Sequence, residues 1–282
     1  MIKGGLQACS VTDAFLNDPY GTLKELAGYG YRYIESAGTM FTEELKAELC
    51  ELKKMMDDLG IVHPSKHFNI GDDIYQDIDR LHIIGGEYLV LASDFFRSRD
   101  DVLERCEKYN QQGKLLKENG LKYIYHNHAH EFQKFEEKSA LELLVENTDP
   151  DYVNFEIDTM WVFRGGEDPV EVLKKFGNRV KMLHVDDFHP KYMEHRSFFD
   201  GLPENTVIDG EFMGKYNFDV ATDIGTGVMN IQEVLDAAAA YNDVEYGFIE
   251  LSSANSAYKE NMLKAAEFGI RALEKYNGVC FE

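Results

Sequence analysis

Short apolar runs alternate with longer amphipathic segments along the whole chain, from Gly5 to Tyr276. This alternation is typical of repeated strand–helix units that build a parallel sheet. The eight predicted strands span residues 5–9, 31–35, 61–68, 88–92, 121–128, 152–158, 180–185 and 246–251. The eight predicted helices span residues 21–27, 42–59, 72–85, 100–119, 140–146, 169–176, 231–241 and 258–276.

The residues at the helix ends support these boundaries. Thr42 and Glu44 open one predicted helix and Gly60 follows it, while Pro169 begins another, as is common in first turns. Eight units favour a closed (β/α)8 TIM barrel over an open sheet. No G-x-G-x-x-G turn follows the first strand, which removes the main signal of a dinucleotide-binding fold. We therefore expect one barrel domain over residues 1–282.

Two connections stand out from the regular pattern. Residues 12–18 are predicted to be a loop after the first strand. Residues 186–230, after the seventh strand, are too long for a simple connection in a compact domain. We expect this long segment to be a functional lid or a binding loop.

Polar residues occur at the carboxyl end of most predicted strands, which is where TIM barrels carry their active sites. Each follows aliphatic or aromatic residues, so the placement indicates one shared site rather than scattered surface charge. In chain order they are Glu35, His67, His126, His128, Glu131, Asp158, His184 and Glu250.

The densest cluster follows the fifth strand, where His126 and His128 alternate with Tyr125 and Asn127. Alternation along a strand places the two histidines on one face. If that face is the barrel interior, they are metal ligands or acid–base groups, and if it faces the helices, at least one is a core histidine. We expect His130 to be solvated.

The other candidates have two interpretations each. Asp158 shares a strand face with Glu156, so a carboxylate pair enters one interior, with Glu156 as a supporting group. Glu35 and His67 are either substrate-binding residues or ordinary loop residues. Trp161 is either a core aromatic residue or a wall against which a sugar packs.

Carboxylates and an imidazole that converge from several strands predict a divalent-cation site. Ligation rich in oxygen, with one nitrogen, suits Mn, Mg or Co better than a structural zinc site, which prefers cysteine. Such an ion polarises a carbonyl and stabilises an enediolate, so that protons alpha to the carbonyl can move. Carbohydrate chemistry is the natural use of such a site.

The charge of the chain excludes several partners. It carries 51 acidic and 29 basic side chains, a formal net charge of -22, which repels nucleic acid and anionic membranes. The four cysteines are far apart without a CxxC pair, which favours reduced thiols that act as packing residues. No run approaches the ~20 apolar residues of a membrane span, and the start lacks an apolar signal region. We expect a cytoplasmic protein.

Four motifs, in order and spacing, resemble the xylose isomerase-like TIM barrels, or sugar phosphate isomerase/epimerase superfamily, which includes ketose 3-epimerases and inosose dehydratases. The resemblance spans nearly the whole chain. The motifs are Tyr125-His126-Asn127-His128-x-x-Glu131-Phe132, Asp158-Thr159-x-Trp161-Val162 with Gly166-x-Asp168-Pro169, His184-Val185-Asp186-Asp187, and Ile224-Gly225-Thr226-Gly227.

The resemblance implies a divalent metal, Mn before Mg, Co or Zn, held by Glu131, Asp158, His184 and Glu250. In the family's ketose 3-epimerases, metal-bound glutamates serve as the acid–base pair. In this chain we expect His126 or His128 to act as base or acid, and Glu131 and Glu250 to be ligands that also transfer protons. In the ketose epimerases the first glutamate lies on the strand itself, where this chain has Tyr125, so its role passes to Glu131 or partly to His126 or His128. Asp186 stands where the family commonly has lysine, which weakens the case for a phosphorylated substrate.

This histidine-rich version is closer to the dehydratase and lyase branch, including enzymes that cleave 3-oxo-glycosides. We expect a lyase or dehydratase that acts on a sugar or cyclitol through an enediolate, with Glu35, His67 and Trp161 binding the substrate. The alternatives are an isomerase or epimerase, a noncatalytic sugar-binding subunit, and an endonuclease IV-like repair enzyme, which would need three zinc ions and a basic face. A homo-oligomer or a partner subunit is compatible with the sequence.

Overall fold

Eight parallel strands form a closed barrel in the computed structural model, which describes residues 1–37, 49–203, 206–215 and 220–281. The barrel closes because the last of these strands pairs with the first, from Lys3 opposite Tyr246 to Leu6 opposite Ile249. The predicted (β/α)8 barrel is therefore confirmed. In chain order the strands are β1 (Ile2–Gln7), β2 (Tyr33–Ala37), β3 (Ser65–Phe68), β4 (Tyr88–Leu91), β5 (Lys122–His126), β8 (Val153–Asp158), β9 (Val180–His184) and β12 (Tyr246–Ile249). A short strand, β13 (Val279–Cys280), adds to β1 and brings the two ends of the chain together.

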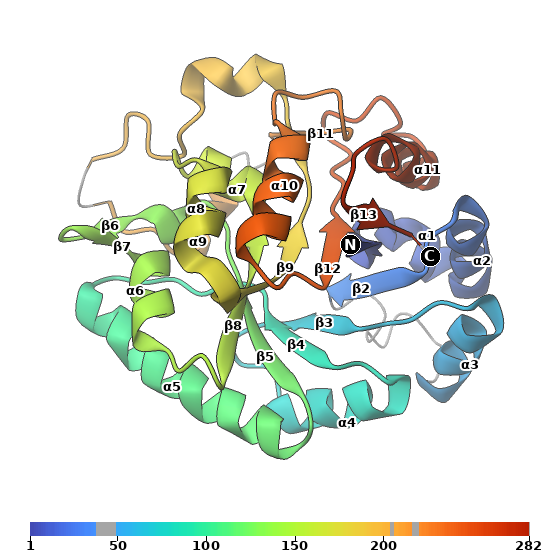
Figure 1. Cartoon of the computed structure of the whole chain (residues 1–282), viewed down its shortest axis with the longest axis horizontal. Helices are drawn as coiled ribbons and strands as arrows, with labels where there is room; N and C mark the ends of the chain where they lie inside the picture. Colours follow the sequence, from blue (N-terminus) through green and yellow to red (C-terminus); the bar gives the residue numbers. More distant parts are fainter. Residues whose placement is uncertain (38–48, 204–205, 216–219, 282) are drawn as a thin grey trace.

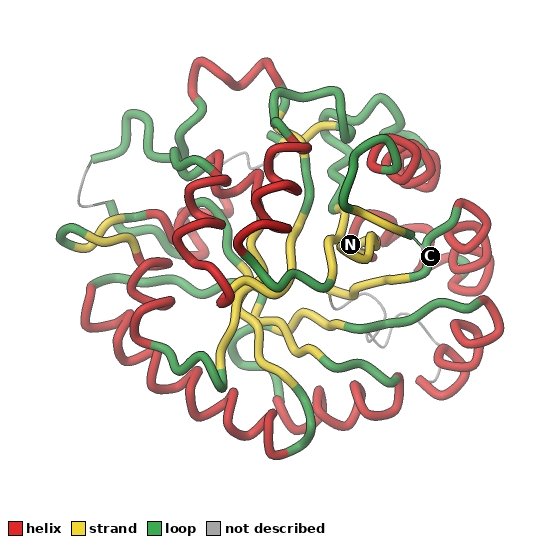
Figure 2. Tube along the Cα trace, in the orientation of Figure 1, coloured by secondary structure: helices red, strands yellow, loops and turns green. Residues whose placement is uncertain are grey.

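The helices surround this barrel (Figure 1), and the strands lie inside the ring of helices (Figure 2). Glycines follow α2 and α4 in the left-handed conformation, as expected for helix ends. Residues 42–48, which begin the predicted helix 42–59, lie outside the described residues. The main helices are α2 (Pro19–Tyr29), α3 (Leu49–Leu59), α4 (Ile74–Ile84), α5 (Arg99–Glu118), α6 (Ala140–Asn147), α8 (Pro169–Phe176), α10 (Ile231–Tyr241) and α11 (Met262–Leu273).

An apolar plug fills the lower part of the barrel. Its buried members come from four strands and are Tyr88, Val90, Ile124, Met182, Tyr246 and Phe248. Side chains two residues apart share a strand face, so the next inward positions are His126 above Ile124, His184 above Met182 and Glu250 above Phe248. The inward face therefore changes from apolar to polar at the carboxyl ends of the strands.

The connection predicted as a loop at residues 12–18 was wrong, because it contains helix α1 (Thr12–Asn17), preceded by a 3-10 turn at Ala8–Val11. Phe15 is fully buried and anchors this short helix in the main core. One apolar anchor over six residues gives no helical periodicity to read in a sequence. The packing of Phe15 against the main core, and not a local pattern, therefore stabilises helix α1.

The long segment after β9 packs over the carboxyl ends of the strands. Its described parts include the antiparallel strands β10 (Asp187–Phe188) and β11 (Ala221–Thr222), a 3-10 helix at Pro190–His195 and helix α9 (Gly210–Lys215). Phe198 and Ile208 are buried against Ala129, in the connection that follows β5. The segment therefore forms part of the wall beside the β5 connection. None of the described helices has both the length and the apolar content to cross a membrane.

Two helical glycines predict opposite effects of the same substitution. A Cβ at Gly113 of α5 would lie 2.3 Å from the carbonyl oxygen of Tyr152, whereas a Cβ at Gly28 of α2 has nothing within 4 Å. We expect Gly113→Ala to destabilise the protein by about 1–3 kcal/mol, because α5 must move away from the barrel. Gly28→Ala should be neutral or stabilising by up to about 1 kcal/mol, from helix propensity. Urea unfolding of both variants measures the difference, and equal effects would contradict the close approach.

Candidate active site and metal centre

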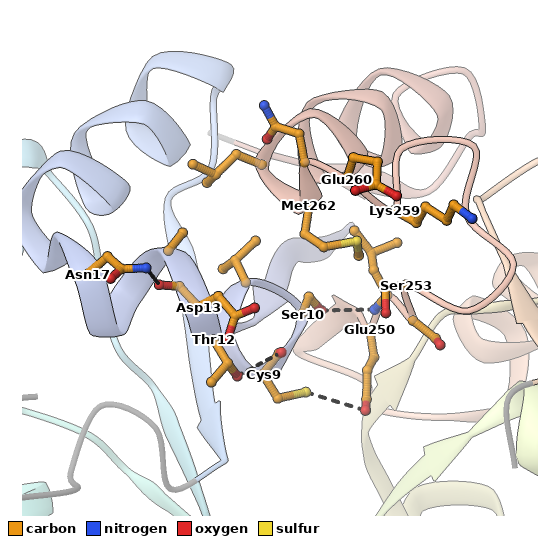
Figure 3. A pocket seen from close by; sticks show the side chains of 16 residues that line it. Cys9, Ser10, Thr12, Asp13, Asn17, Glu250, Ser253, Lys259, Glu260 and Met262 are labelled. Carbon is orange, nitrogen blue, oxygen red and sulfur yellow. Dashed lines mark hydrogen bonds between the residues drawn. The ribbon is translucent and has the colours of Figure 1, made fainter. Parts of the chain in front are cut away.

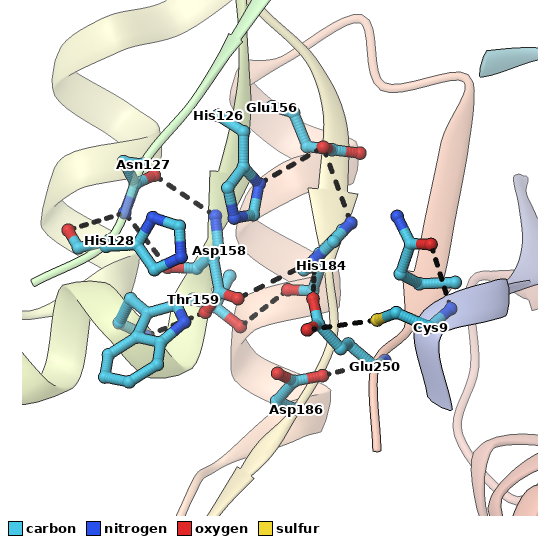
Figure 4. Close-up of polar contacts among 12 residues, drawn as sticks. Cys9, His126, Asn127, His128, Glu156, Asp158, Thr159, His184, Asp186 and Glu250 are labelled. Atoms are coloured by element: carbon cyan, nitrogen blue, oxygen red, sulfur yellow. Dashed lines mark hydrogen bonds and ion pairs between the residues drawn. The ribbon is translucent and has the colours of Figure 1, made fainter. Parts of the chain in front are cut away.

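Asp158, His184 and Glu250 meet at the upper end of the barrel, from β8, β9 and the end of β12 (Figure 4). His184 Nδ1 lies 2.9 Å from Glu250 Oε2 and 3.7 Å from Asp158 Oδ2. The ligand atoms of all three residues lie within 4.8 Å of one another. Yet none of the described residues forms an aligned hydrogen bond with Asp158 Oδ2 or His184 Nδ1, although both atoms are buried. Buried polar atoms without hydrogen bonds are costly and indicate a missing partner.

These three residues fit a divalent cation. Burial, with the neighbouring charges of Glu250 and Glu156, raises the pKa of Asp158 to about 8, against the opposing effects of His184 and of the Trp161 N–H, which donates to Asp158 Oδ1 at 2.7 Å. Burial acts in the same direction on Glu250, but the close contact with His184 and the charge of its ring lower the pKa of Glu250 to about 2. A cation between the three side chains would satisfy the unbonded atoms and favour both carboxylates in their charged form. Three protein ligands leave coordination positions open for a substrate, which is typical of catalytic rather than structural metal sites.

Two further residues hold Glu250 in this arrangement. The Cys9 thiol lies 3.4 Å from Glu250 Oε1 as a donor, and Asp186 Oδ1 accepts the Glu250 backbone N–H at 3.0 Å. Burial and the neighbouring Glu250 raise the pKa of Cys9 well above its usual value, so the thiol keeps its proton. The sequence analysis missed the role of Cys9, although its place at the end of the first predicted strand was a usable signal.

A second polar layer lies directly below and consists of Glu35, His67, His126 and Glu156. Glu156 Oε2 lies 3.0 Å from His67 Nε2, 3.2 Å from His126 Nδ1 and 3.4 Å from His184 Nε2. These nitrogen and oxygen atoms also have the spacing of a metal site. Each nitrogen in these pairs already faces a carboxylate oxygen. The other oxygens, Glu35 Oε2 and Glu156 Oε1, are buried and form no hydrogen bond with the described residues. Against the opposing effect of burial, Glu35 and Glu156 raise the pKa of His67 to about 9, which keeps it cationic between them.

Glu35 fixes the orientation of the His184 ring. Glu35 Oε1 lies 2.8 Å from His184 Nε2 and also accepts a hydrogen bond from Gln7 Nε2 at 2.9 Å. With Nε2 donating to Glu35, His184 Nδ1 is left to face Asp158 and Glu250. A carboxylate behind a histidine ligand is a common device that fixes the tautomer and increases the affinity for metal. The structure thus places Glu35, predicted to bind substrate, behind the His184 ring and fully buried.

The two histidines of the β5 end face the barrel interior, as one of the two interpretations expected. His126 contacts Glu156, and the His128 ring lies 5.1 Å from His126 and 5.5 Å from Trp161. Burial lowers the pKa of His128 well below its usual value, so the ring is neutral at pH 7. None of the described residues forms a hydrogen bond with its Nδ1. His128 lies beside Asp158 (Figure 4). The Trp161 ring adjoins His128, and its backbone N–H is bonded to Asp158.

Glu131 lies on the other side of the β5 end, away from the group formed by Asp158, His184 and Glu250. Its two oxygens accept hydrogen bonds from the Tyr125 hydroxyl at 3.0 Å and from the His128 backbone N–H at 2.9 Å. The structure therefore does not bring Glu131 together with the other three predicted ligands.

His130 is buried, so the prediction that it is solvated was wrong. Its Nε2 lies 3.0 Å from the carbonyl oxygen of Asp94, and its ring stacks on Phe95 at 4.8 Å. The reason is the 3-10 turn at His130–Phe132, which folds the chain back against the connection after β4.

Removing the charge behind His184 should weaken metal binding without removing a ligand. We expect Glu35→Gln to lower the affinity for Mn²⁺ by about 10–100-fold, because the ring loses its charged acceptor. Competition with a chromophoric chelator measures the affinity directly. The control is Glu118→Gln, which makes the same change at an exposed position of α5. Unchanged affinity in a folded Glu35→Gln variant would contradict the orienting role.

Comparisons with known proteins identify the family of this chain. An inosose dehydratase from Clostridium perfringens (strain 13 / Type A) is 32% identical over 150 residues, 50% of this chain and 50% of the relative, so the chain matches about half the length of that relative. A sugar phosphate isomerase/epimerase structure from Parabacteroides distasonis ATCC 8503 superposes with a TM-score of 0.76 at 24% identity, covering 99% of this chain and 96% of its own. The zinc-containing IolI protein gives a TM-score of 0.70 at 16% identity, covering 98% and 100%. These two structures show a shared fold. The model of the xylose isomerase-like TIM barrel family matches residues 23–267, and the chain belongs to that family.

Proposed function

We propose that this protein is a divalent-metal-dependent enzyme that removes a proton alpha to the carbonyl of a sugar or cyclitol and then expels a beta substituent. The observation that carries the proposal is the convergence of Asp158 Oδ2, His184 Nδ1 and Glu250 Oε2, two of which are buried without an aligned hydrogen bond to any described residue. The similarity to inosose dehydratases supports the dehydratase reaction over other reactions of the family.

Asp158, His184 and Glu250 would hold the cation. When bound, a divalent cation supplies polarisation of the substrate carbonyl and stabilises the negative charge that develops on its oxygen. We favour Mn²⁺, because two carboxylates and one imidazole form an oxygen-rich set. Zinc is the main competitor, as the IolI protein of the same fold contains a zinc atom.

His128 is the proposed base. It is neutral because burial lowers its pKa, and a neutral imidazole can accept the alpha proton. As an imidazolium it can return that proton to a departing hydroxyl, so that the overall change is loss of water. Glu131 serves as a positioning residue, because its hydrogen bond to the His128 N–H fixes the backbone at the end of β5. Trp161 offers a flat wall next to His128 for one face of the sugar ring.

Epimerisation is the second candidate, and one observation favours it. His128 and Glu250 lie on different sides of Asp158 (Figure 4), so the two groups could serve opposite faces of a planar intermediate. The fold is also shared with a D-psicose 3-epimerase, at a TM-score of 0.65 and 11% identity. The reaction product separates the candidates, because elimination yields an unsaturated product and epimerisation returns an isomer of the same mass.

Metal removal tests the proposal directly. We expect metal-free protein to be inactive and Mn²⁺ to restore solvent deuterium uptake alpha to the carbonyl, followed by NMR on a panel of keto-inositols, 3-keto-glycosides and ketohexoses in D2O. Asp158→Asn should lose both the metal and the exchange, because it removes a ligand charge. The control is Asp151→Asn, which makes the same change at an exposed aspartate just before β8, the strand that ends at Asp158. Full activity in a metal-free preparation would refute the mechanism, and metal binding without exchange on any of these compounds would favour a noncatalytic sugar-binding subunit.

The roles of His128 and Glu131 can be separated from metal ligation. We expect His128→Asn to lower kcat by about 10²–10⁴-fold, the usual contribution of a positioned base, while the metal content stays at the wild-type level. Glu131→Gln should also keep the metal and lose less activity, since a glutamine oxygen can still accept the His128 N–H. Metal analysis together with kinetics measures both effects. Loss of metal in Glu131→Gln would instead identify Glu131 as a ligand.

A further inference from the structure

A cavity of about 600 Å³ lies beside the proposed cation site, between the α1 region and the connection from Glu250 to the start of α11 (Figure 3). This volume is in the usual range for small-molecule sites. Much of its lining consists of uncharged side chains that can donate and accept hydrogen bonds. They are Ser10, Thr12, Asn17, Ser252, Ser253 and Asn261.

Glu250 connects this cavity with the cation site. Its side chain is 36% exposed, whereas the side chains of Asp158 and His184 are fully buried. Cys9, which donates to Glu250, also lines the cavity. Glu250 therefore lies between the proposed cation site and the cavity, so a ligand bound beside Glu250 would lie next to the cavity.

The charge of the lining disfavours a phosphate. Apart from Glu250, which the proposed function assigns to the cation, the lining has two carboxylates, Asp13 and Glu260, against a single cation, Lys259, a formal sum of -1. Lys66, the lysine next to His67, cannot compensate, because it is buried in an ion pair with Asp77 at 3.1 Å. A cavity with excess carboxylates and many hydroxyl groups suits the hydroxyls of a sugar, which can donate to the carboxylates.

We propose that this cavity binds a second sugar ring of an unphosphorylated substrate and selects against a phosphorylated one. The inference rests on the proposed function, since it assumes that the first ring reacts at the cation. One ring at the cation leaves the cavity free, and the neutral lining supplies hydrogen bonds to the hydroxyls of the other ring. The substrate class is therefore a keto-disaccharide or keto-glycoside with a neutral second sugar.

Equilibrium binding tests the charge selection without turnover. Trehalose, cellobiose and lactose are titrated into Mn²⁺-loaded protein, with trehalose 6-phosphate as the charged counterpart, and the backbone amide shifts of Ser252, Ser253 and Asn261 are followed by NMR. We expect the neutral disaccharides to shift these amides and trehalose to bind at least about tenfold more tightly than its phosphate. The double variant Asp13→Lys/Glu260→Lys should remove this preference by strengthening the binding of trehalose 6-phosphate. No shift with any neutral disaccharide, or tighter binding of the phosphate to the wild-type protein, would overturn the inference.

A cavity-filling variant tests the same site by kinetics. Ser253 is exposed, lines the cavity and belongs to neither the cation ligands nor their supports. We expect Ser253→Trp to raise KM for a keto-disaccharide at least about tenfold, while kcat and KM for the matching keto-monosaccharide remain those of the wild-type protein. Equal KM for the keto-disaccharide in the two proteins would contradict the second-ring site. If no substrate exchanges deuterium but the disaccharides still shift the cavity amides, the proposed chemistry fails and the binding site stands.

Discussion

The two-sided contact of His184 with carboxylates is the interaction on which the rest of the site depends. Its Nε2 faces Glu35 at 2.8 Å and Glu156 at 3.4 Å, and its Nδ1 faces Glu250 at 2.9 Å. The ring is fully buried above the apolar plug of the barrel. Charges so far from water are tolerated only when they are paired, and removing one partner leaves the others uncompensated. A change in Glu35 or Glu156 of the lower layer is therefore expected to affect His184, and through it the proposed cation site.

Strand register brings these residues to one level. Asp158 is opposite His184 because the pairing of β8 with β9 shifts by one residue between Phe155 and Glu156. Without that shift Asp158 would lie level with Leu183 instead of His184. Leu183 and His184 are adjacent on β9, so their side chains point to opposite faces of the sheet. A one-residue slip changes which face a side chain serves, so irregular pairing close to a site has a direct consequence for its geometry. The shift in the β8–β9 pairing therefore brings Asp158 to the same level along the barrel axis as His184.

The sequence predicted the parts of this arrangement that depend on local pattern. Apolar runs identified each strand of the barrel, and strand periodicity correctly placed His126 and His128 on one shared face, although it left open whether that face was the inner one. A sequence pattern gives the strand face on which a side chain lies but not its level along the barrel axis, so Glu35 and His67 could not be recognised as members of a lower layer. The positions of residues beyond the strands depend on turns, which the pattern does not predict. His130 is buried through contacts with Asp94 and Phe95 from another connection, and no local signal in the sequence encodes such a contact.

The buried charges also connect the cation with protonation. Without a cation, the pKa of His184 is raised well above its usual value, since Glu156, Glu250 and Glu35 outweigh the effect of burial. The ring then carries a positive charge that balances the carboxylates on both sides. A cation needs the Nδ1 lone pair, so its binding must release that proton while Nε2 keeps its hydrogen bond to Glu35. The proton on His184 Nδ1 and a divalent cation are therefore alternatives at this nitrogen, and the cation would replace the single charge of the proton with two.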